Sequence, residues 1–206
     1  MTEASTMAAM SFSSPPQFGQ CSRSSAKTRS SSLAQLSRTA RRCAQFASHA
    51  AGCAAGVIEY LADKVGRERF WPKEDAARAM ARSMVAEMHS GYAALRRQCP
   101  MNIRRRVEGA ELSPEARADV VRILTLWAEA RARFGKGGPF LFGSFCAADI
   151  IYAPVVSRFI TYAVVVPGFA VNYMQAVWEH EWLQIWIEAA EAEDWVIEQW
   201  EVPAVK

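Results

Sequence analysis

Apolar residues recur at helical spacing through most of the chain after residue 57, and this pattern predicts a bundle of helices. The expected helices cover 57–65, 73–98 and 113–134, then a helix that begins near Cys146, and further helices over 170–179 and 180–193. Gly66 is expected to end the first helix, and Pro72 separates it from the second because a proline disfavours helix at the residue before it. We therefore expect an all-α fold.

The helix expected over 73–98 is amphipathic. Acidic residues stand at its start and basic residues at its end, which suits the helix dipole, and Pro100 follows it. At 100° per residue, one face holds a stripe of apolar side chains that we interpret as core: Ala77, Met80, Ala81, Met84, Met88, Tyr92 and Leu95. Ser113 followed by Pro114 is a typical start for the next helix.

The helix that begins near Cys146 is apolar almost all round, so it is either buried at the centre of the domain or spans a membrane. Pro154 and Pro167 interrupt the apolar run, and the neighbouring helices are amphipathic, so the buried position is favoured and no membrane is expected. Arg158 carries the one charge between residues 150 and 172. We expect it to form a structural ion pair with Asp149 or with a carboxylate of a neighbouring helix.

The start of this central helix has the spacing of a capping box. Cys146 occupies the cap position, and Asp149, three residues later, can accept a hydrogen bond from the backbone amide of Cys146. Phe145 and Ile150 have the spacing of a hydrophobic staple. These features predict structural capping by Cys146 and Asp149 rather than catalysis.

Residues 1–56 differ in composition from the rest of the chain. They hold six basic residues, one acidic residue and twelve serines, with few large apolar residues. Such a segment cannot bury enough apolar surface to offset its ordering entropy, so we expect it to be disordered, or a frayed Ala-rich helix around residues 40–55. A transit peptide and a nucleic-acid arm are alternatives, but a solvated tail is favoured and no nucleic-acid partner is expected.

The chain holds few candidates for metal or redox chemistry. Its five cysteines form no CxxC pair and no cluster with histidine, so we expect no metal and a reducing, cytoplasmic location. On the second helix, Arg78, Arg82, His89 and Arg96 share a stripe that either faces an anionic ligand or is a solvated basic face. The run of three arginines at 104–106 is expected to lie in a solvated loop.

Several segments together resemble the glutathione S-transferase family. Residues 141–150, LFGSFCAADI, resemble the capping-box signature of that family's helical domain, and residues 58–63, IEYLAD, resemble the last helix of its thioredoxin-like domain. A Trp71-Pro72 linker and the long helix then follow in the family's order, and residues 86–89, AEMH, are similar to a segment of the bacterial beta class. The resemblance divides the chain into a basic segment over 1–56, a remnant last helix with linker over 57–72, and a C-terminal-like helical domain over 73–206.

The resemblance implies that glutathione is the co-substrate and that it is conjugated to a small hydrophobic electrophile. It also implies a homodimer if the family interface is kept. Family members place an apolar site on the corresponding helices, which here points to five substrate-binding candidates: Met88, His89, Tyr92, Tyr152 and Phe159. No catalytic residue is assigned.

The family's glutathione-binding residues are not recognisable in the first segment. The Glu-Ser pair that opens the last thioredoxin-like helix should fall at Cys53 and Ala54, and no proline lies between Pro16 and Pro72 where the family's cis-proline would stand. We interpret residues 1–56 as either an out-of-frame stretch or the remains of a lost domain. The alternative function is therefore a non-catalytic helical domain for dimerisation or apolar ligand binding.

Overall fold

The computed structural model describes residues 54–198 and 201, which form seven α-helices and one short 3-10 helix. These are α2 (Ala54–Val65), η1 (Arg67–Arg69), α3 (Asp75–Ser90), α4 (Ala93–Gln98), α5 (Pro114–Phe134), α6 (Ala147–Thr161), α7 (Gly168–Trp178) and α8 (Glu181–Glu191). Within residues 54–198 there is no strand, only two isolated bridges in the turn before α6. The predicted all-α class is confirmed. The disorder predicted for residues 1–56 concerns a segment outside the described residues, apart from its last three, which begin α2.

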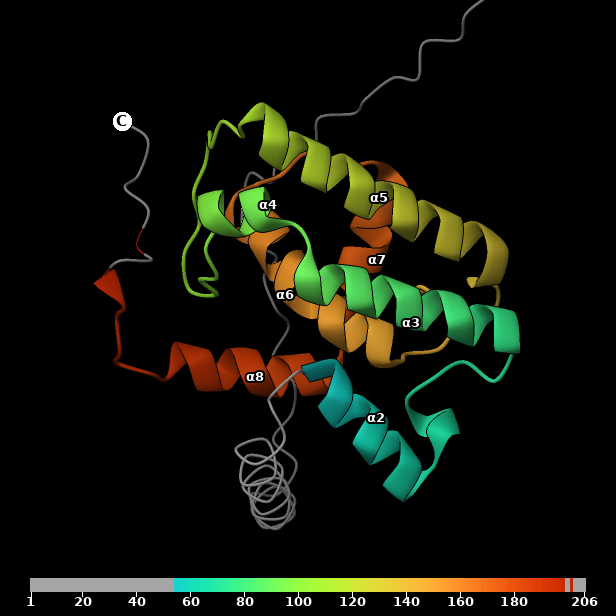
Figure 1. Cartoon of the computed structure of the whole chain (residues 1–206). Coiled ribbons are helices and arrows are strands. Elements are labelled where there is room, and N and C mark those ends of the chain that lie inside the picture. Colours follow the sequence, from blue (N-terminus) through green and yellow to red (C-terminus); the bar gives the residue numbers. More distant parts are fainter. Residues whose placement is uncertain (1–53, 199–200, 202–206) are drawn as a thin grey trace, which may run out of the picture.

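Helix α6 lies at the centre of the bundle (Figure 1). It packs against α3 and α7, while α5 packs against α3, α4 and α7. The amide of Ala147 donates to the carbonyl of Phe70 at 2.8 Å, so the connector between η1 and α3 is attached to the start of α6. Two thirds of α6 is buried, in agreement with the central position predicted from its apolar sequence. Among the described helices, none is long and apolar enough to cross a membrane.

Aromatic side chains fill the centre of the core. The Trp127 ring of α5 is fully buried and lies with its centroid 4.7 Å from Tyr173, 5.6 Å from Tyr152 and 5.7 Å from Phe159. The contacts with Tyr173 and Tyr152 are edge to face, a favoured arrangement for aromatic pairs. Trp127 therefore joins α5, α6 and α7.

The single helix predicted over 73–98 is wrong, because the chain breaks between α3 and α4. Gly91 is extended, and Tyr92 has a φ of 59°, in the left-handed region that is uncommon for residues other than glycine. A Cβ atom on Gly91 would lie 2.7 Å from the carbonyl oxygen of Glu87. Tyr92 and Leu95 are nevertheless buried, so the predicted apolar stripe continues across the break.

The other predicted helix ends agree with the structure to within a few residues. Gly66, with a φ of 108°, follows α2, and the hydroxyl of Ser113 accepts a hydrogen bond from the amide of Ala116 at the start of α5. His180 caps α8, since its Nδ1 atom accepts from the amide of Trp182 at 3.3 Å. Local sequence signals therefore set these boundaries.

The ion pair predicted for Arg158 is wrong. Its guanidinium donates to two backbone carbonyls instead, that of Cys99 at 2.9 Å and that of Pro154 at 3.1 Å, and burial lowers the pKa of Arg158. Asp149 is engaged elsewhere, with backbone amides at the start of its own helix. Two carbonyl oxygens, one at the end of α4 and one a turn earlier in α6, thus take the place of a carboxylate.

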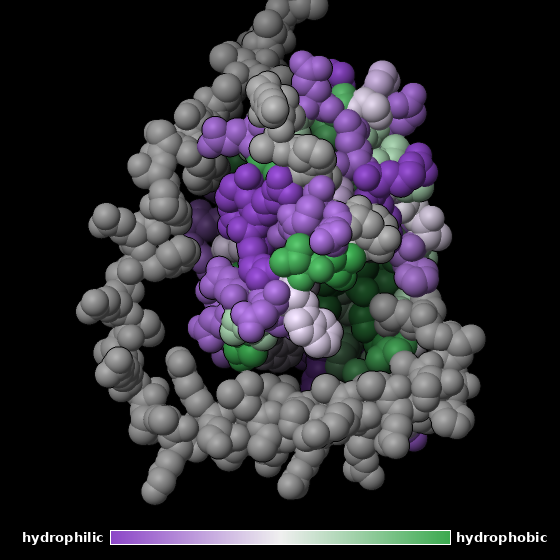
Figure 2. Space-filling model, turned by 90° about the vertical axis from the view of Figure 1, so that its left-hand side faces the viewer, coloured by the Kyte–Doolittle hydropathy of each residue, from purple (hydrophilic) through white to green (hydrophobic). Residues whose placement is uncertain are grey.

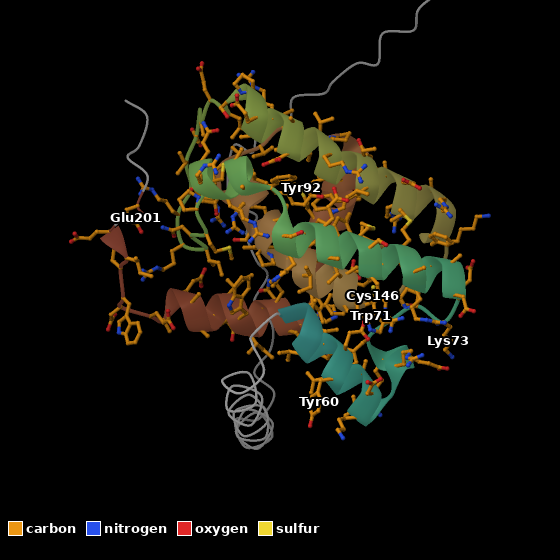
Figure 3. All side chains as sticks on the ribbon, viewed as in Figure 1. Tyr60, Trp71, Lys73, Tyr92, Cys146 and Glu201 are labelled. Atoms are coloured by element: carbon orange, nitrogen blue, oxygen red, sulfur yellow. The ribbon has the colours of Figure 1, made fainter. Side chains whose placement is uncertain are left out.

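The three arginines at 104–106 lie in a loop, as predicted, and Arg104 and Arg106 are exposed, but Arg104 and Arg105 also bond to other parts of the chain. Arg104 donates to the carbonyls of Glu193 and Trp195, and Arg105 forms a 2.6 Å ion pair with Glu201. The loop between α4 and α5 therefore holds the chain that follows α8. Figure 3 shows Glu201 at this edge of the molecule.

Candidate functional site

Four of the five predicted substrate-binding residues lie inside the domain. Met88 and Tyr92 are buried near the junction of α3 and α4, and Tyr152 and Phe159 are buried on α6. His89 is exposed on the last turn of α3, next in sequence to Met88. The structure thus gathers the four apolar candidates around the contact of α3 with α6 and leaves the histidine at the surface.

A polar network lies beside these side chains. Glu87 of α3 accepts two hydrogen bonds from Arg122 of α5, at 2.7 and 2.9 Å, and a third from the Tyr92 hydroxyl at 3.1 Å. The Arg122 bonds hold the pKa of Glu87 below its ordinary value. The carboxylate therefore stays ionised at neutral pH and connects α3, α5 and the chain just after the helix break.

The two tyrosines of this region remain neutral. Burial raises the pKa of Tyr92 to about 12, and burial also raises the pKa of Tyr152, whose hydroxyl points to the carbonyl of Met84 at 3.5 Å. A neutral phenol can donate a hydrogen bond but cannot act as a base. As placed, both hydroxyl groups bond to protein atoms and stabilise the fold.

The basic stripe predicted on the long helix is used within the protein. Arg82 donates to both carboxylate oxygens of Glu59 on α2, at 2.7 and 2.9 Å, and its guanidinium lies 5.3 Å from the centre of the Trp71 ring. Arg78 donates to the backbone carbonyls of Pro72 and Lys73, and Arg96 donates to that of Met88. These arginines attach α2, the connector and the end of α3 to one another.

A surface depression of about 340 Å³ lies where α2, η1 and the start of α3 meet. We name it the Trp71 depression, and it is lined by Ala62, Asp63, Gly66, Arg67, Glu68, Trp71, Pro72, Lys73 and Arg78. Its charged side chains form exposed pairs, Lys73 with Glu68 at 3.2 Å and Arg67 with Asp63 at 3.8 Å. In Figure 3, Trp71 lies below α3 near Cys146, and Lys73 lies near the start of α3.

Trp71 forms the floor of this depression. The side chain is buried, and within the described part of the chain its indole nitrogen has no hydrogen-bond partner. Sequence reasoning identified Trp71-Pro72 as a linker but did not identify a depression there. The available signal was a buried-type residue flanked on both sides by charged residues, Arg67, Glu68 and Lys73.

The start of α6 is a capping site in the structure. The Asp149 carboxylate accepts from the amide of Cys146 at 2.8 Å and from the amide of Leu141 at 3.2 Å, and Cys146 and Asp149 form a capping box. Burial raises the pKa of Asp149 to about 6 and raises the pKa of the Cys146 thiol above its ordinary value. The thiol is therefore protonated at neutral pH and a poor nucleophile.

Phe145, the residue predicted to form a hydrophobic staple with Ile150, packs against three other aromatic rings. The Phe145 ring stacks on His180 with a centroid distance of 3.7 Å and meets Phe140 and Trp182 edge to face. This aromatic cluster connects the segment before α6 to the start of α8.

Over residues 54–198 and 201, no group of three or more His, Cys, Asp or Glu side chains could hold a metal ion.

Comparison with known proteins shows a similarity in fold to a solved structure. No protein-family model matches the chain, and no curated protein matches it. Among solved structures, it is similar to a glutathione transferase homolog from Burkholderia gl BGR1 with bound glutathione. The identity is 19%, the match covers 69% of this chain and 68% of that chain, and the TM-score is 0.51. The described residues therefore have the helical fold of a glutathione transferase C-terminal domain.

Proposed function

We propose that this chain is a glutathione transferase-type protein that binds glutathione and conjugates it to hydrophobic electrophiles. The observation that carries the proposal is the likeness in fold to a homolog with bound glutathione. In such a reaction the thiolate sulfur forms a bond to the electrophilic carbon, and the leaving group departs with its electron pair. The thiol proton passes to solvent. No described residue is assigned the role of activating the thiol.

The Trp71 depression is our candidate for the charged ends of glutathione, which carries two carboxylates and one ammonium group. Arg67 and Lys73 would meet the carboxylates, and Asp63 or Glu68 would meet the ammonium group. These side chains form exposed ion pairs, which contribute only about 0–1 kcal/mol each, so ligand charges can replace the partners at little cost. The match of charge types supports this placement.

The apolar acceptor is assigned to the candidates named from the sequence, Met88, His89, Tyr92, Tyr152 and Phe159. The exposed His89 would meet the acceptor first, and the other four candidates are buried in the core cluster. We also propose a domain boundary between residues 72 and 73, and that the chain forms a homodimer.

Titration calorimetry with glutathione tests the binding step, and conjugation to a chloronitrobenzene, followed by absorbance, tests the chemistry. Lys73→Glu is expected to weaken glutathione binding about threefold to thirtyfold, because one exposed attraction is lost and a repulsion is added, each worth up to about 1 kcal/mol. Lys136→Glu, at an exposed lysine after α5, is the matched control and should bind as the wild type does. The absence of binding by the wild-type chain would overturn the proposal.

A second candidate function is a non-catalytic helical domain that dimerises or binds an apolar ligand. The observation that favours it is the burial of four of the five acceptor candidates, all of which are packed within the core cluster. On this alternative, His89→Ala changes nothing measurable. If conjugation is the function, His89→Ala raises the KM for the electrophile, and Arg117→Ala, at an exposed site on α5, does not.

A further inference from the structure

Helix α8 has an apolar stripe on the side that faces away from the core. Leu183 and Ile187 are buried and attach the helix to the bundle. The opposite side carries Trp182, Ile185, Trp186 and Ala189, which follow the i, i+3, i+4, i+7 spacing of one helical face and are all exposed. We name these four residues the α8 outer face. Trp182 is 57% exposed, and Trp195, in the chain just after α8, is 83% exposed.

Acidic residues surround the α8 outer face. Residues 179–201 contain eight acidic residues and no lysine or arginine. All of them except Glu201 take part in none of the salt bridges formed among the described residues: Glu179, Glu181, Glu188, Glu191, Glu193, Asp194 and Glu198. Figure 2 shows the end of the molecule to which this segment leads, where hydrophobic surface lies directly beside strongly hydrophilic surface. The face therefore fits an apolar partner with positive charges.

The chain itself contains a segment with these properties. Residues 27–46 hold five of the six basic residues that precede α2, Lys27, Arg29, Arg38, Arg41 and Arg42, and no acidic residue. The same stretch contributes Leu33, Leu36 and Phe46 as apolar side chains. Its charge is opposite to that of residues 179–201, and its apolar residues match a face that exposes two tryptophans and an isoleucine.

The tether allows the segment to reach the face. Residue 46 is eight residues before the start of α2, and an extended chain of that length spans about 26 Å. Ile58 of α2 and Leu183 of α8 belong to the same core cluster, so the segment enters the fold on a helix that shares its core with α8. A tether of this kind gives an effective concentration in the millimolar range, at which weak charge and apolar contacts suffice for binding.

We propose that residues 27–46 bind the α8 outer face within the same chain and neutralise the acidic surface around it. A second copy of the face is a poor occupant, because each surface keeps an excess of negative charge and two such surfaces repel each other: residues 179–201 hold eight acidic residues, against the three arginines of the 104–106 loop that contacts them. The bound segment shields Trp182 and Trp186 from water. Since the contacts combine surface charge pairs with apolar burial, high salt weakens the association.

Hydrogen exchange of the full-length chain, read by mass spectrometry on peptides covering residues 181–198, tests this proposal. Arg38→Glu/Arg41→Glu/Arg42→Glu is expected to accelerate exchange there about tenfold, because each reversed charge turns an attraction into a repulsion. Arg117→Glu/Lys136→Glu, at two exposed residues on and after α5, is the control and should leave this exchange unchanged. Acrylamide quenching of tryptophan fluorescence should rise in the first variant only.

A charge exchange separates direct contact from a general effect on stability. Glu188→Arg/Glu191→Arg/Asp194→Arg alone should also accelerate exchange, and its combination with the triple glutamate variant should restore slow exchange. Equal exchange in the wild type and the triple glutamate variant would overturn the proposal. So would protection that increases with protein concentration between 1 and 50 µM, because it would identify a second copy as the occupant.

Discussion

Substitution of Asp149 should destabilise the fold by an amount that depends on pH. In Asp149→Ala, the amides of Cys146 and Leu141 lose their acceptor in a site that is shielded from water. An unsatisfied buried amide costs about 1–3 kcal/mol, so the two together predict a loss of about 2–6 kcal/mol in the free energy of unfolding. Asp149→Asn keeps one carbonyl acceptor and should lose about 1 kcal/mol less.

The pH dependence follows from the raised pKa of Asp149. Since burial lifts this pKa from 3.8 to about 6, the folded state binds a proton more tightly than the unfolded state does. The stabilisation from that proton is fully present below pH 3.8 and is lost as the pH rises through 6. Linkage over this range gives about 2 kcal/mol between pH 4.5 and 7.5. Asp149→Ala should therefore cost more at pH 4.5 than at pH 7.5.

Urea unfolding followed by tryptophan fluorescence at both pH values measures this difference. Asp63→Ala, at an exposed position on α2, is the matched control and should change the free energy of unfolding by less than about 0.5 kcal/mol. A loss below 1 kcal/mol in Asp149→Ala, or a loss of the same size at the two pH values, would refute the reasoning from the buried carboxylate.

Three further perturbations address the helix break, the core and the cap of α8. Gly91→Ala places a Cβ atom 2.7 Å from the Glu87 carbonyl oxygen, so urea unfolding should show a loss of about 1–3 kcal/mol; an unchanged midpoint would contradict that contact. Trp127→Ala should lower the free energy of unfolding by about 3–5 kcal/mol, whereas Val121→Ala, at an exposed position, should lower it by less than about 0.5 kcal/mol. Equal effects of the two substitutions would contradict the central position of the Trp127 ring. Burial lowers the pKa of His180, so its contribution to stability is present above pH 6.5 and is lost as the pH falls below that value. His180→Asn keeps a capping oxygen and should lose less stability between pH 7 and 5.5 than the wild type; parallel curves would contradict this.

Local signals in the sequence predicted the helix starts well. Ser113 and the Cys146–Asp149 spacing each place a polar acceptor beside free backbone amides, and the structure has a cap at both positions. The same reasoning failed at Gly91 and Tyr92, because apolar residues continue at helical spacing across the break. Periodicity reports which side chains are buried, and it does not report that the backbone between them is continuous.

The partners of charged residues could not be predicted, since they are set by contacts between distant segments. Arg158 bonds to a carbonyl 59 residues away, and Arg105 pairs with Glu201 across 96 residues. A composition-based expectation treats these arginines as solvated or paired with the nearest acid. The burial of Met88 and Tyr152 likewise depends on how closely α3 approaches α6, which helical spacing does not determine.

The attachment of Arg82 to Glu59 and Trp71 has a mechanical consequence. Arg82 of α3 forms two parallel hydrogen bonds with Glu59 of α2, and its guanidinium lies over the indole ring of Trp71 in the connector. Arg82 therefore links three consecutive segments of the chain. A pulling force applied at residue 54 would therefore load α3 directly instead of peeling α2 away. Force on the start of α2 is thus passed to α3 through this side-chain contact as well as through the backbone.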